Sequence, residues 1–597
     1  MAKGQYKSAL SYQLSALRRY PFLTMVSVGL AFLASLFQAL PIIILGQAID
    51  ELHTSMSLTP RFITFVWMIV GIACALFATI FLVGYSFAIM VLRWERDARQ
   101  EFFEVLQDNS MTFHDQIDSK TLLAVAMQDI RWIRFSLNPA LRTIITTIGS
   151  FLITVVFLWL IDFTIGIIAV VGIPLYLYFA YRYAVTVEPI RRKRSEQNER
   201  LTSISQEVFR GIEVVRAFGS EEYEEEKFRK ISMEYQEIQT NEGRLAAFYL
   251  PALIMTAVTG LSFLYGANQA LLGIFSVGTL VEMLGLLIAL DAYGFILPRF
   301  LLEIRGGYVN AQRLVNILNW KDPMTEPDKS RLTVNWAGDI VFENVNFSYT
   351  NNNGKNSNYA LKNLNFRIPG GSRVALIGGP GGGKSTILKL LLRLYDPTEG
   401  RVLIDGTDLR SIHTKKVRKA VGLVEQDIFL FRMSIRDNIA FGNMLASDEE
   451  VIEAAKRAQA HEFISLMPDG YETKIGERGM TLSGGQRQRL AIARTILHDP
   501  KVLLLDDSVS AIDAQTEYSL RKALSEVMQG RTSITVTQRL RALLESDLIV
   551  VVDKGELVAI GTHKELLKTS DHYHRIFEKL PGALQYANGV IKTGGAI

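Results

Sequence analysis

The sequence predicts a protein in two parts, an α-helical membrane domain followed by an α/β domain of the phosphate-loop class. Three observations lead to this fold class. At 597 residues, the chain is too long for a single domain. Roughly its first half carries long stretches without a charged side chain, whereas the second half alternates charged and apolar runs. A glycine-rich segment, GGPGGGKST at residues 378–386, directly follows a short apolar run in the second half.

The first half contains six apolar runs that we interpret as membrane spans, because about 20 apolar residues cross the hydrocarbon core. The first two runs are well separated, and the third and fourth are divided only by Asp162. The fifth is long enough for one span and a turn, and the sixth contains Asp291. The runs cover residues 21–49, 62–92, 143–161, 163–181, 245–281 and 283–298.

The distribution of basic residues predicts the orientation of these spans. Lysines and arginines precede the first span and follow the second and fourth, whereas the other connections carry few, with Arg61 the clearest exception. Basic residues mark the cytoplasmic side. We therefore expect a multi-pass protein of the cell (plasma) membrane with both termini in the cytoplasm. Residues 1–20, which lack a cleavage site, are expected to form an amphipathic segment on the membrane surface.

Two polar, helix-prone stretches, residues 93–142 and 182–244, are too long to be turns. Neither has enough apolar residues for a core of its own, so we interpret them as cytoplasmic extensions of the membrane helices rather than as a soluble insert. The formal net charge of +4 gives no case for binding nucleic acid. Cys74 is the single cysteine, which excludes a disulfide framework or a cysteine-based zinc site within one chain.

The second half carries the pattern of a phosphate-binding loop. Residues 374–377 are predicted to form a buried strand, and an apolar helical pattern begins directly after the loop. Glycines let backbone N–H groups converge on phosphate oxygens, Lys384 is expected to reach the β and γ phosphates, and Ser385 to ligate Mg²⁺. The predicted nucleotide-binding residues of the loop are Gly378, Gly379, Pro380, Gly381, Gly382, Gly383, Lys384, Ser385 and Thr386.

A second apolar strand, KVLLLDD at residues 501–507, ends in two carboxylates. Many strands end in aspartate, so this signal is moderate when taken alone. Together with the phosphate loop, it predicts that Asp506 ligates Mg²⁺. The expected cofactors are therefore ATP and Mg²⁺.

The segment LSGGQRQRL, residues 482–490, lies between these two motifs, and together they resemble the ABC ATPases. The domain order is similar to that of six-span ABC exporters, and the resemblance covers nearly the whole chain. It implies that Tyr349 stacks on adenine, that Gln426 contacts Mg²⁺, and that Ser483, Gly484, Gly485 and Gln486 form the signature that caps the γ-phosphate on an opposite subunit. It further implies an interface role for Asp513 and a contact of Glu477 with the membrane domain. Residues 113–122 and 211–224 look like the two cytoplasmic loops of exporters.

Two positions depart from the family pattern. Asp507 stands where the family has the glutamate that polarises the attacking water, and Gln538 stands where it has histidine. The shorter side chain draws the carboxylate back, and an amide cannot donate a proton as imidazole can. Both catalytic positions are thus altered at one site, whereas the signature is intact. The chain therefore resembles one half of a heterodimeric exporter, the half whose own ATP site has altered catalytic residues and is called degenerate.

The predicted function is ATP-driven export of an amphipathic drug, lipid or peptide by alternating access, with a second ABC half-transporter as the partner. Two alternatives stay open: a homodimer with slow hydrolysis, and a regulatory or gating ATP-binding subunit. Asp291 has two readings, a contact in the translocation pathway or an ion pair with an arginine such as Arg142, Arg182 or Arg299. The expected domains are the amphipathic segment 1–20, the six-span domain 21–320, a linker 321–338, the ATP-binding domain 339–580 and a tail 581–597.

Overall fold

The computed structural model describes residues 6–247, 250–294, 297–327, 336–349, 359–476, 482–506, 522–580 and 583, with only the backbone described at 184, 246–247 and 291–294. The chain forms two compact units. The first comprises residues 1–108 and 120–320, and the second comprises residues 109–119 and 321–597. A short piece of the N-terminal half therefore belongs to the second unit.

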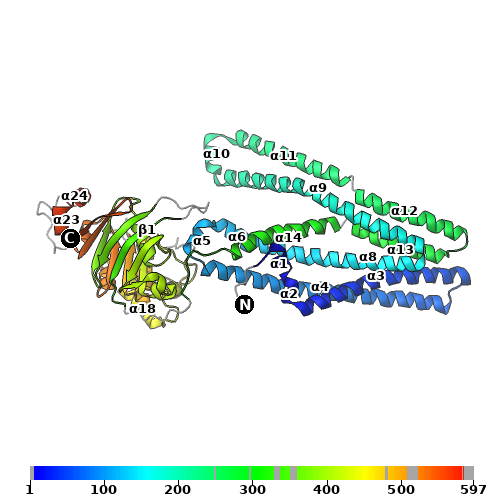
Figure 1. Ribbon diagram of the computed structural model, residues 1–597, viewed down its shortest axis with the longest axis horizontal. Coiled ribbons are helices and arrows are strands. Elements are labelled where there is room, and N and C mark those ends of the chain that lie inside the picture. Colours follow the sequence, from blue (N-terminus) through cyan, green and yellow to red (C-terminus); the bar gives the residue numbers. More distant parts are fainter. Residues whose placement is uncertain are drawn as a thin grey trace. The chain divides into compact units, whose positions relative to one another are not determined.

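The first unit is built of helices, several of them much longer than a membrane span needs. The 49-residue α4 and the 48-residue α9 continue without interruption from apolar into polar sequence, and α9 and α11 lie side by side with α10 at their turn (Figure 1). The helices are α1 (Ala9–Gln13), α2 (Ser15–Arg19), α3 (Pro21–Ser55), α4 (Pro60–Asp108), α6 (Ser119–Ala124), α7 (Ile130–Phe135), α8 (Arg142–Ile161), α9 (Phe163–Arg210), α10 (Ile212–Phe218), α11 (Glu221–Ala247), α12 (Leu250–Leu271), α13 (Val277–Gly294) and α14 (Leu297–Leu318). Two π-helical segments, Val125–Asp129 and Ser136–Leu141, flank α7.

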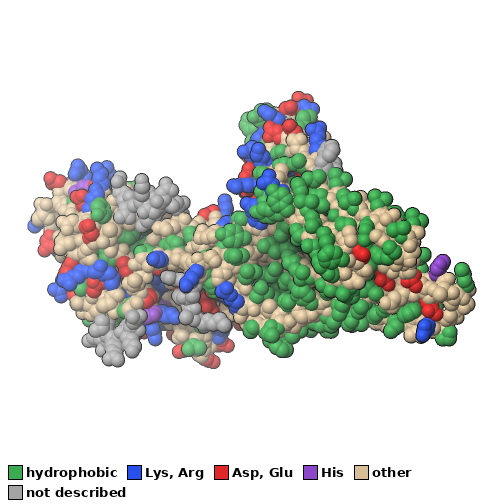
Figure 2. All heavy atoms as spheres, turned by 45° about the vertical axis from the view of Figure 1, so that its right-hand side comes forward, with side chains coloured by type: hydrophobic (Ala, Val, Ile, Leu, Met, Phe, Trp, Pro, Cys, Tyr) green, Lys and Arg blue, Asp and Glu red, His purple; other side chains and the backbone are tan. Residues whose placement is uncertain are grey.

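The helices of this unit expose large apolar side chains to their surroundings. Trp67, Phe77, Leu160 and Leu253 are each at least 65% exposed. Figure 2 shows such side chains as a broad band with few charges over the helical unit. Among the described residues, five helical stretches are long and apolar enough to cross a membrane, and α13 contributes a shorter apolar stretch. The count of six spans stays a prediction.

The N-terminal segment packs against the rest of the first unit. Tyr12 is buried, its ring meets Trp94 of α4 edge to face, and Gln13 Nε2 donates to the Ile304 carbonyl oxygen of α14 at 2.9 Å. Arg19 pairs with Glu101 of α4 at 2.9 Å. Protein therefore covers these side chains, and the placement of residues 1–20 on the membrane surface stays a prediction.

The second unit contains two sheets. The larger has six strands in the order β10-β9-β3-β8-β7-β6, with a parallel core and an antiparallel edge at β10. The smaller is antiparallel, in the order β2-β1-β4-β5. The strands are β1 (Ile340–Phe347), β2 (Leu361–Ile368), β3 (Arg373–Ile377), β4 (Glu399–Ile404), β5 (Thr407–Asp408), β6 (Val421–Val424), β7 (Val502–Asp506), β8 (Thr532–Val536), β9 (Leu548–Asp553) and β10 (Glu556–Gly561).

Helices cover these sheets and bury their apolar faces. Strands β3, β7 and β9 are nearly continuous apolar runs because they are buried on both faces, as parallel strands usually are. The helices are α5 (Met111–Gln116), α15 (Lys384–Leu391), α16 (Thr414–Ala420), α17 (Ile435–Ala440), α18 (Asp448–Arg457), α19 (His461–Ser465), α20 (Gly484–His498), α22 (Leu540–Leu544), α23 (His563–Thr569) and α24 (Asp571–Glu578).

Candidate nucleotide site

The phosphate loop connects the central strand β3 to the N-terminus of α15. Strand β3 pairs in parallel with β8 on one side and β9 on the other, so the loop leaves the middle of the sheet at its carboxyl edge. A Cβ atom at Gly378 would overlap the Val552 carbonyl oxygen, and Gly383 has φ of +97°. Both positions need glycine, the first because the backbones approach so closely and the second because of its left-handed conformation.

The N-terminus of α15 is free of a side-chain cap, since Gly383 occupies the N-cap position. Helix N-terminal N–H groups bind phosphate oxygens well when nothing else satisfies them. Lys384 Nζ donates to the carbonyl oxygens of Gly378 and Gly379 at 3.0 and 2.8 Å. The ammonium group is thus held directly over the loop, where it would meet a bound phosphate.

Ser385 and Asp506 are brought together from α15 and the end of β7. The Ser385 hydroxyl donates to the Asp506 carboxylate at 3.1 Å. A hydroxyl and a carboxylate oxygen are hard ligands of the kind that Mg²⁺ prefers. These two side chains therefore fit a magnesium ion bound beside the loop.

Tyr349 lies beside the same helix. Its hydroxyl and that of Thr386 are 3.1 Å apart, and Lys389 Nζ lies 5.6 Å from the centre of its ring. Tyr395 meets the Tyr349 ring edge to face at 5.4 Å between centroids. Aromatic packing of this kind fixes the orientation of the Tyr349 ring, as a platform for a flat base requires.

Gln426 and Gln538 lie at the same edge of the sheet as the loop. Gln426 follows β6 and Gln538 follows β8, each two residues past the strand end, and both are exposed. Strand β7 pairs in parallel with both β6 and β8, so the end that carries Asp506 lies between them. Asp507, Glu477 and Asp513 lie outside the described residues.

The signature residues form the exposed N-terminus of α20. Ser483 is the N-cap: its oxygen accepts from the Gln486 N–H, and the Gln486 side chain accepts from the Ser483 N–H at 2.9 Å. A Cβ atom at Gly484 would meet no heavy atom within 4 Å, whereas Gly485 is buried. The Ser483 hydroxyl hydrogen remains available to a partner, and this helix end can accept an anion from outside the chain.

The structure also shows a hydrogen-bonded pair of residues that the sequence did not predict. Tyr395 is 5% exposed, and its hydroxyl donates to Asp115 of α5 at 2.6 Å. Burial raises the pKa of the Tyr395 phenol, and the hydrogen bond to Asp115 raises it further. The two residues are 280 positions apart. Asp115 lies in the stretch that resembles a cytoplasmic loop of exporters, but nothing in the sequence pointed to Tyr395 as its partner.

The segment that carries α5 is also tied to residues after 320. Ser110 donates to Asp322 from its N–H and its hydroxyl, at 2.6 and 2.7 Å. The Thr414 N–H donates to Glu326 at 3.2 Å. Burial acts to raise the pKa of Glu326, but hydrogen bonds from Thr414 together with the charges of His413 and Arg393 lower that pKa overall. The start of the expected linker is therefore fixed to the second unit.

Comparison with known families gives two matches. The profile of the family described as "ABC transporter transmembrane region" matches residues 24–290. The profile described as "ABC transporter" matches residues 361–510, which include the phosphate loop, the signature and Asp506. The two profiles correspond to the membrane part and the nucleotide-binding part of the chain.

Individual proteins match over most of their length. An uncharacterized ABC transporter ATP-binding protein of Bacillus subtilis, YknU, is 35% identical over 80% of this chain and 82% of its own. An ATP-dependent lipid A-core flippase of Syntrophus aciditrophicus is 31% identical over 81% of this chain and 80% of its own. The solved structure of a bacterial Atm1-family ABC exporter with ATP bound has a TM-score of 0.80 and 28% identity, over 97% of this chain and 99% of that one.

Proposed function

This chain belongs to the ABC transporter family, as a membrane domain fused to an ATP-binding domain, and from that premise we propose that it is the degenerate-site half of a heterodimeric, ATP-driven exporter. The observation that carries the proposal is the contrast within its nucleotide site. The groups that bind nucleotide and metal are assembled, whereas Gln538 occupies the catalytic position after β8.

The geometry of the loop supports the binding roles that we propose. Lys384 and the uncapped N–H groups of α15 bind the phosphates, and Tyr349 stacks on the adenine. Ser385 and Asp506 hold Mg²⁺ together with Gln426, since all three lie at one sheet edge. A bound Mg²⁺ supplies charge neutralisation for the β- and γ-phosphate oxygens.

The two residues at the catalytic positions of this site, Asp507 and Gln538, are less suited to hydrolysis than the family's glutamate and histidine. Asp507 is one methylene shorter than glutamate, and a misplacement of about 1 Å at a reacting group can cost ~100-fold in rate. Gln538 can accept and donate hydrogen bonds but cannot carry a proton as imidazole does. We therefore assign this chain's own site to ATP binding with slow hydrolysis.

The signature serves a second subunit. Ser483 and Gly484 lie at an exposed helix N-terminus, open to a phosphate that another chain presents. Helix α10 of the first unit also exposes Val214 and Phe218, by 60% and 80%. This loop resembles the second cytoplasmic loop of exporters, and we assign it to contact with the partner's ATP-binding domain.

The substrate and the location follow from the membrane part. One relative is named as an ATP-dependent lipid A-core flippase. We infer that this chain exports an amphipathic molecule, from the cytoplasmic side of the cell membrane, with both termini and the ATP-binding domain in the cytoplasm. The basic residues flanking the spans support this orientation.

The test compares the chain alone with the chain joined to a half-transporter that carries glutamate and histidine at the two altered positions. We expect weak ATPase activity from the chain alone and robust activity from the complex. In the complex, Asp507→Ala should change turnover far less than removal of the partner's glutamate, and Asp507→Glu with Gln538→His should raise hydrolysis or leave it unchanged.

Two results would count against the proposal. Robust turnover by a homodimer of this chain would replace the heterodimer with a working homodimer. Loss of all activity in Asp507→Ala would mean that this site hydrolyses ATP in every cycle. A gating role would be indicated instead if a non-hydrolysable ATP analogue supported sustained substrate movement.

A further inference from the structure

Arg142 brings a positive charge alongside apolar membrane helices. It is the first residue of α8, and an atom built at the Cβ position of Gly84 in α4 would lie 3.2 Å from its Nη1. Gly84 belongs to an uncharged run, nine residues before Arg93. At about 1.5 Å per helical residue, this is roughly 13 Å inside the charged end of that run. The guanidinium therefore lies beside the apolar part of α4, where the polar stretch 93–142 meets the span that begins at residue 143.

No counter-charge accompanies this guanidinium in the described part of the chain, which does not include the Asp291 side chain. Its side chain makes no ion pair and no hydrogen bond with any described residue. Other arginines of the first unit differ: Arg134 pairs with Glu95 at 3.0 Å, and Arg299 pairs with Glu303 at 3.1 Å. A cation within a membrane helix is costly, and such residues commonly mark a pathway or a ligand site.

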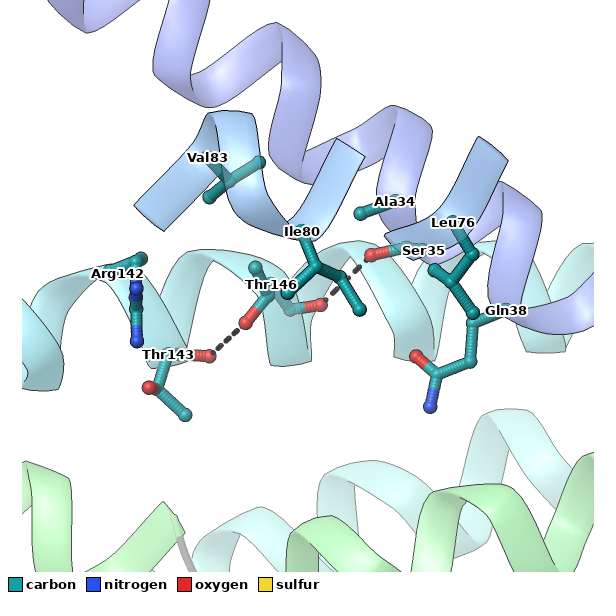
Figure 3. Close-up of a pocket in the computed structure, with 9 residues that line it drawn as sticks. All are labelled: Ala34, Ser35, Gln38, Leu76, Ile80, Val83, Arg142, Thr143 and Thr146. Atoms are coloured by element: carbon teal, nitrogen blue, oxygen red, sulfur yellow. Dashed lines mark hydrogen bonds between the residues drawn. The ribbon is translucent and has the colours of Figure 1, made fainter. Parts of the chain in front are cut away.

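The side chain of Arg142 lines a cavity of about 210 Å³ between α3, α4 and α8. Figure 3 shows the guanidinium and the Gln38 side chain projecting to the same side of α8. Leu76 and Ile80 of α4 supply an apolar wall. The cavity thus combines one cation, one amide and a hydrocarbon surface.

Hydrogen bonds of Ser35 and Thr146 stabilise the part of the cavity wall that α3 and α8 form. The Ser35 hydroxyl of α3 donates to the Thr146 carbonyl oxygen of α8 at 3.2 Å, and the Thr146 hydroxyl donates to the Thr143 carbonyl oxygen at 2.9 Å. The first bond joins α3 to α8, and the second lies within the first turns of α8. The position of Arg142 is therefore set by packing rather than by an ion pair.

We propose that this cavity binds the anionic head group of an acidic amphiphile, a phosphate or carboxylate on an apolar tail, as the transported substrate. A guanidinium forms two parallel, charge-assisted hydrogen bonds with such an anion, and these are strongest where water is excluded. The apolar wall accepts the tail. A cationic drug would meet repulsion from Arg142 instead. This inference rests on the proposed export function and narrows its substrate class.

The test measures binding of radiolabelled dodecyl phosphate, below its micellar concentration, to the full chain with its partner half in phosphatidylcholine nanodiscs without nucleotide. Dodecyl phosphate should bind, whereas dodecyltrimethylammonium and inorganic phosphate should not compete. Arg142→Gln should raise Kd roughly tenfold, about 1.4 kcal/mol. Arg142→Lys should raise Kd less than Arg142→Gln does, because lysine retains the charge but cannot form the two parallel hydrogen bonds.

The matched control is Arg182→Gln, which removes the same charge from an exposed position on α9 and should leave Kd unchanged. Equal binding by wild type and Arg142→Gln would overturn the proposal, and so would competition by inorganic phosphate or by the cationic amphiphile. If Asp291→Asn restored wild-type binding and stability to Arg142→Gln, Arg142 would be an ion-pair partner of Asp291 and the proposal would fall.

A second readout separates this proposal from the export function on which it rests. ATP-dependent movement of a fluorescent acidic amphiphile is measured in proteoliposomes that contain the same complexes. Arg142-dependent binding without ATP-dependent movement would refute export while leaving the site in place. Movement that is equal in wild type and Arg142→Gln would refute the site while leaving export in place.

Discussion

At the scale of single residues, Gly378 shows how the nucleotide loop depends on the sheet beneath it. The Val552 carbonyl oxygen of β9 lies where a side chain would begin. The neighbouring Gly379 has no such constraint, since the nearest atom to its Cβ position is 3.8 Å away. The two glycines are adjacent in sequence, but only Gly379 leaves room for a side chain.

We predict that Gly378→Ala destabilises the ATP-binding unit by roughly 1–3 kcal/mol, the usual cost of an overpacked site. The backbone of the loop or of β9 must move to make room. Thermal unfolding of the full chain without nucleotide measures this cost. Gly379→Ala is the matched control and should change stability by less than about 0.5 kcal/mol. Equal stability of the two variants would show that the loop relaxes freely.

The binding residues could be predicted from sequence because they belong to contiguous motifs with fixed geometry. A strand, a glycine loop and a helix place Lys384 and Ser385 without knowledge of the rest of the chain. The partner of Ser385 could be predicted only by combining two motifs, because Asp506 lies at the end of a separate apolar strand. Tyr395 could not be predicted, since its role depends on contacts between distant segments.

At the scale of elements, α5 is a six-residue helix from the N-terminal half that belongs to the ATP-binding unit. Its Asp115 accepts from Tyr395, which in turn packs on Tyr349. A continuous chain of contacts thus connects the proposed adenine platform to the loop between α4 and α6. We expect occupancy of the nucleotide site to be communicated along it, because a shift of the Tyr349 ring would displace its neighbours.

We predict that Tyr395→Phe weakens this connection while sparing nucleotide affinity. The ring packing against Tyr349 is kept, and only the hydrogen bond to a charged acceptor is lost, which is worth about 1.5–3 kcal/mol. ATP binding should change less than about threefold, whereas stimulation of ATPase activity by substrate should fall. Asp115→Asn should have a similar effect. A large loss of ATP binding in Tyr395→Phe would instead assign the hydroxyl to the nucleotide site.

The positions of the long helices could be predicted from their apolar runs. Their polar extensions could be predicted as well, but not the residues at which these extensions end. The sequence predicted helical extensions beyond the second and fourth spans, and α4 and α9 indeed continue to Asp108 and Arg210. The sequence resembles a cytoplasmic loop at residues 113–122, but it carries no signal for the short helix α5 or for the π-helical segments around α7. They depend on tertiary packing, which overrides local propensity in short segments.

At the scale of the whole molecule, one chain carries one phosphate loop and one signature, and the proposed function assigns them to different ATP sites. The loop serves the weak site of this chain. The signature at the start of α20 serves the partner's site. Damage to the two motifs should therefore have unequal effects on turnover.

We predict that Gly484→Asp stops ATP hydrolysis at the partner's site and stops transport, since a carboxylate would face the γ-phosphate at close range. ATP binding at Lys384 should persist. Lys384→Ala should impair binding at this chain's site and slow the cycle without abolishing it. Steady-state ATPase assays with nucleotide photolabelling distinguish the two variants. Equal losses would show that the two sites are symmetric and would contradict the division of roles.

The contact between Asp115 and Tyr395 also sets an order of events during synthesis. The ribosome adds 280 residues between them, which takes roughly a quarter of a minute to nearly a minute at about 5–20 residues per second. The loop after α4 therefore emerges and waits while all the later membrane helices are made and inserted. During that interval, its carboxylate has no tyrosine to accept from. Docking of this loop is thus a late step of biogenesis, and a nascent chain arrested before residue 395 would hold a finished membrane domain with an undocked loop.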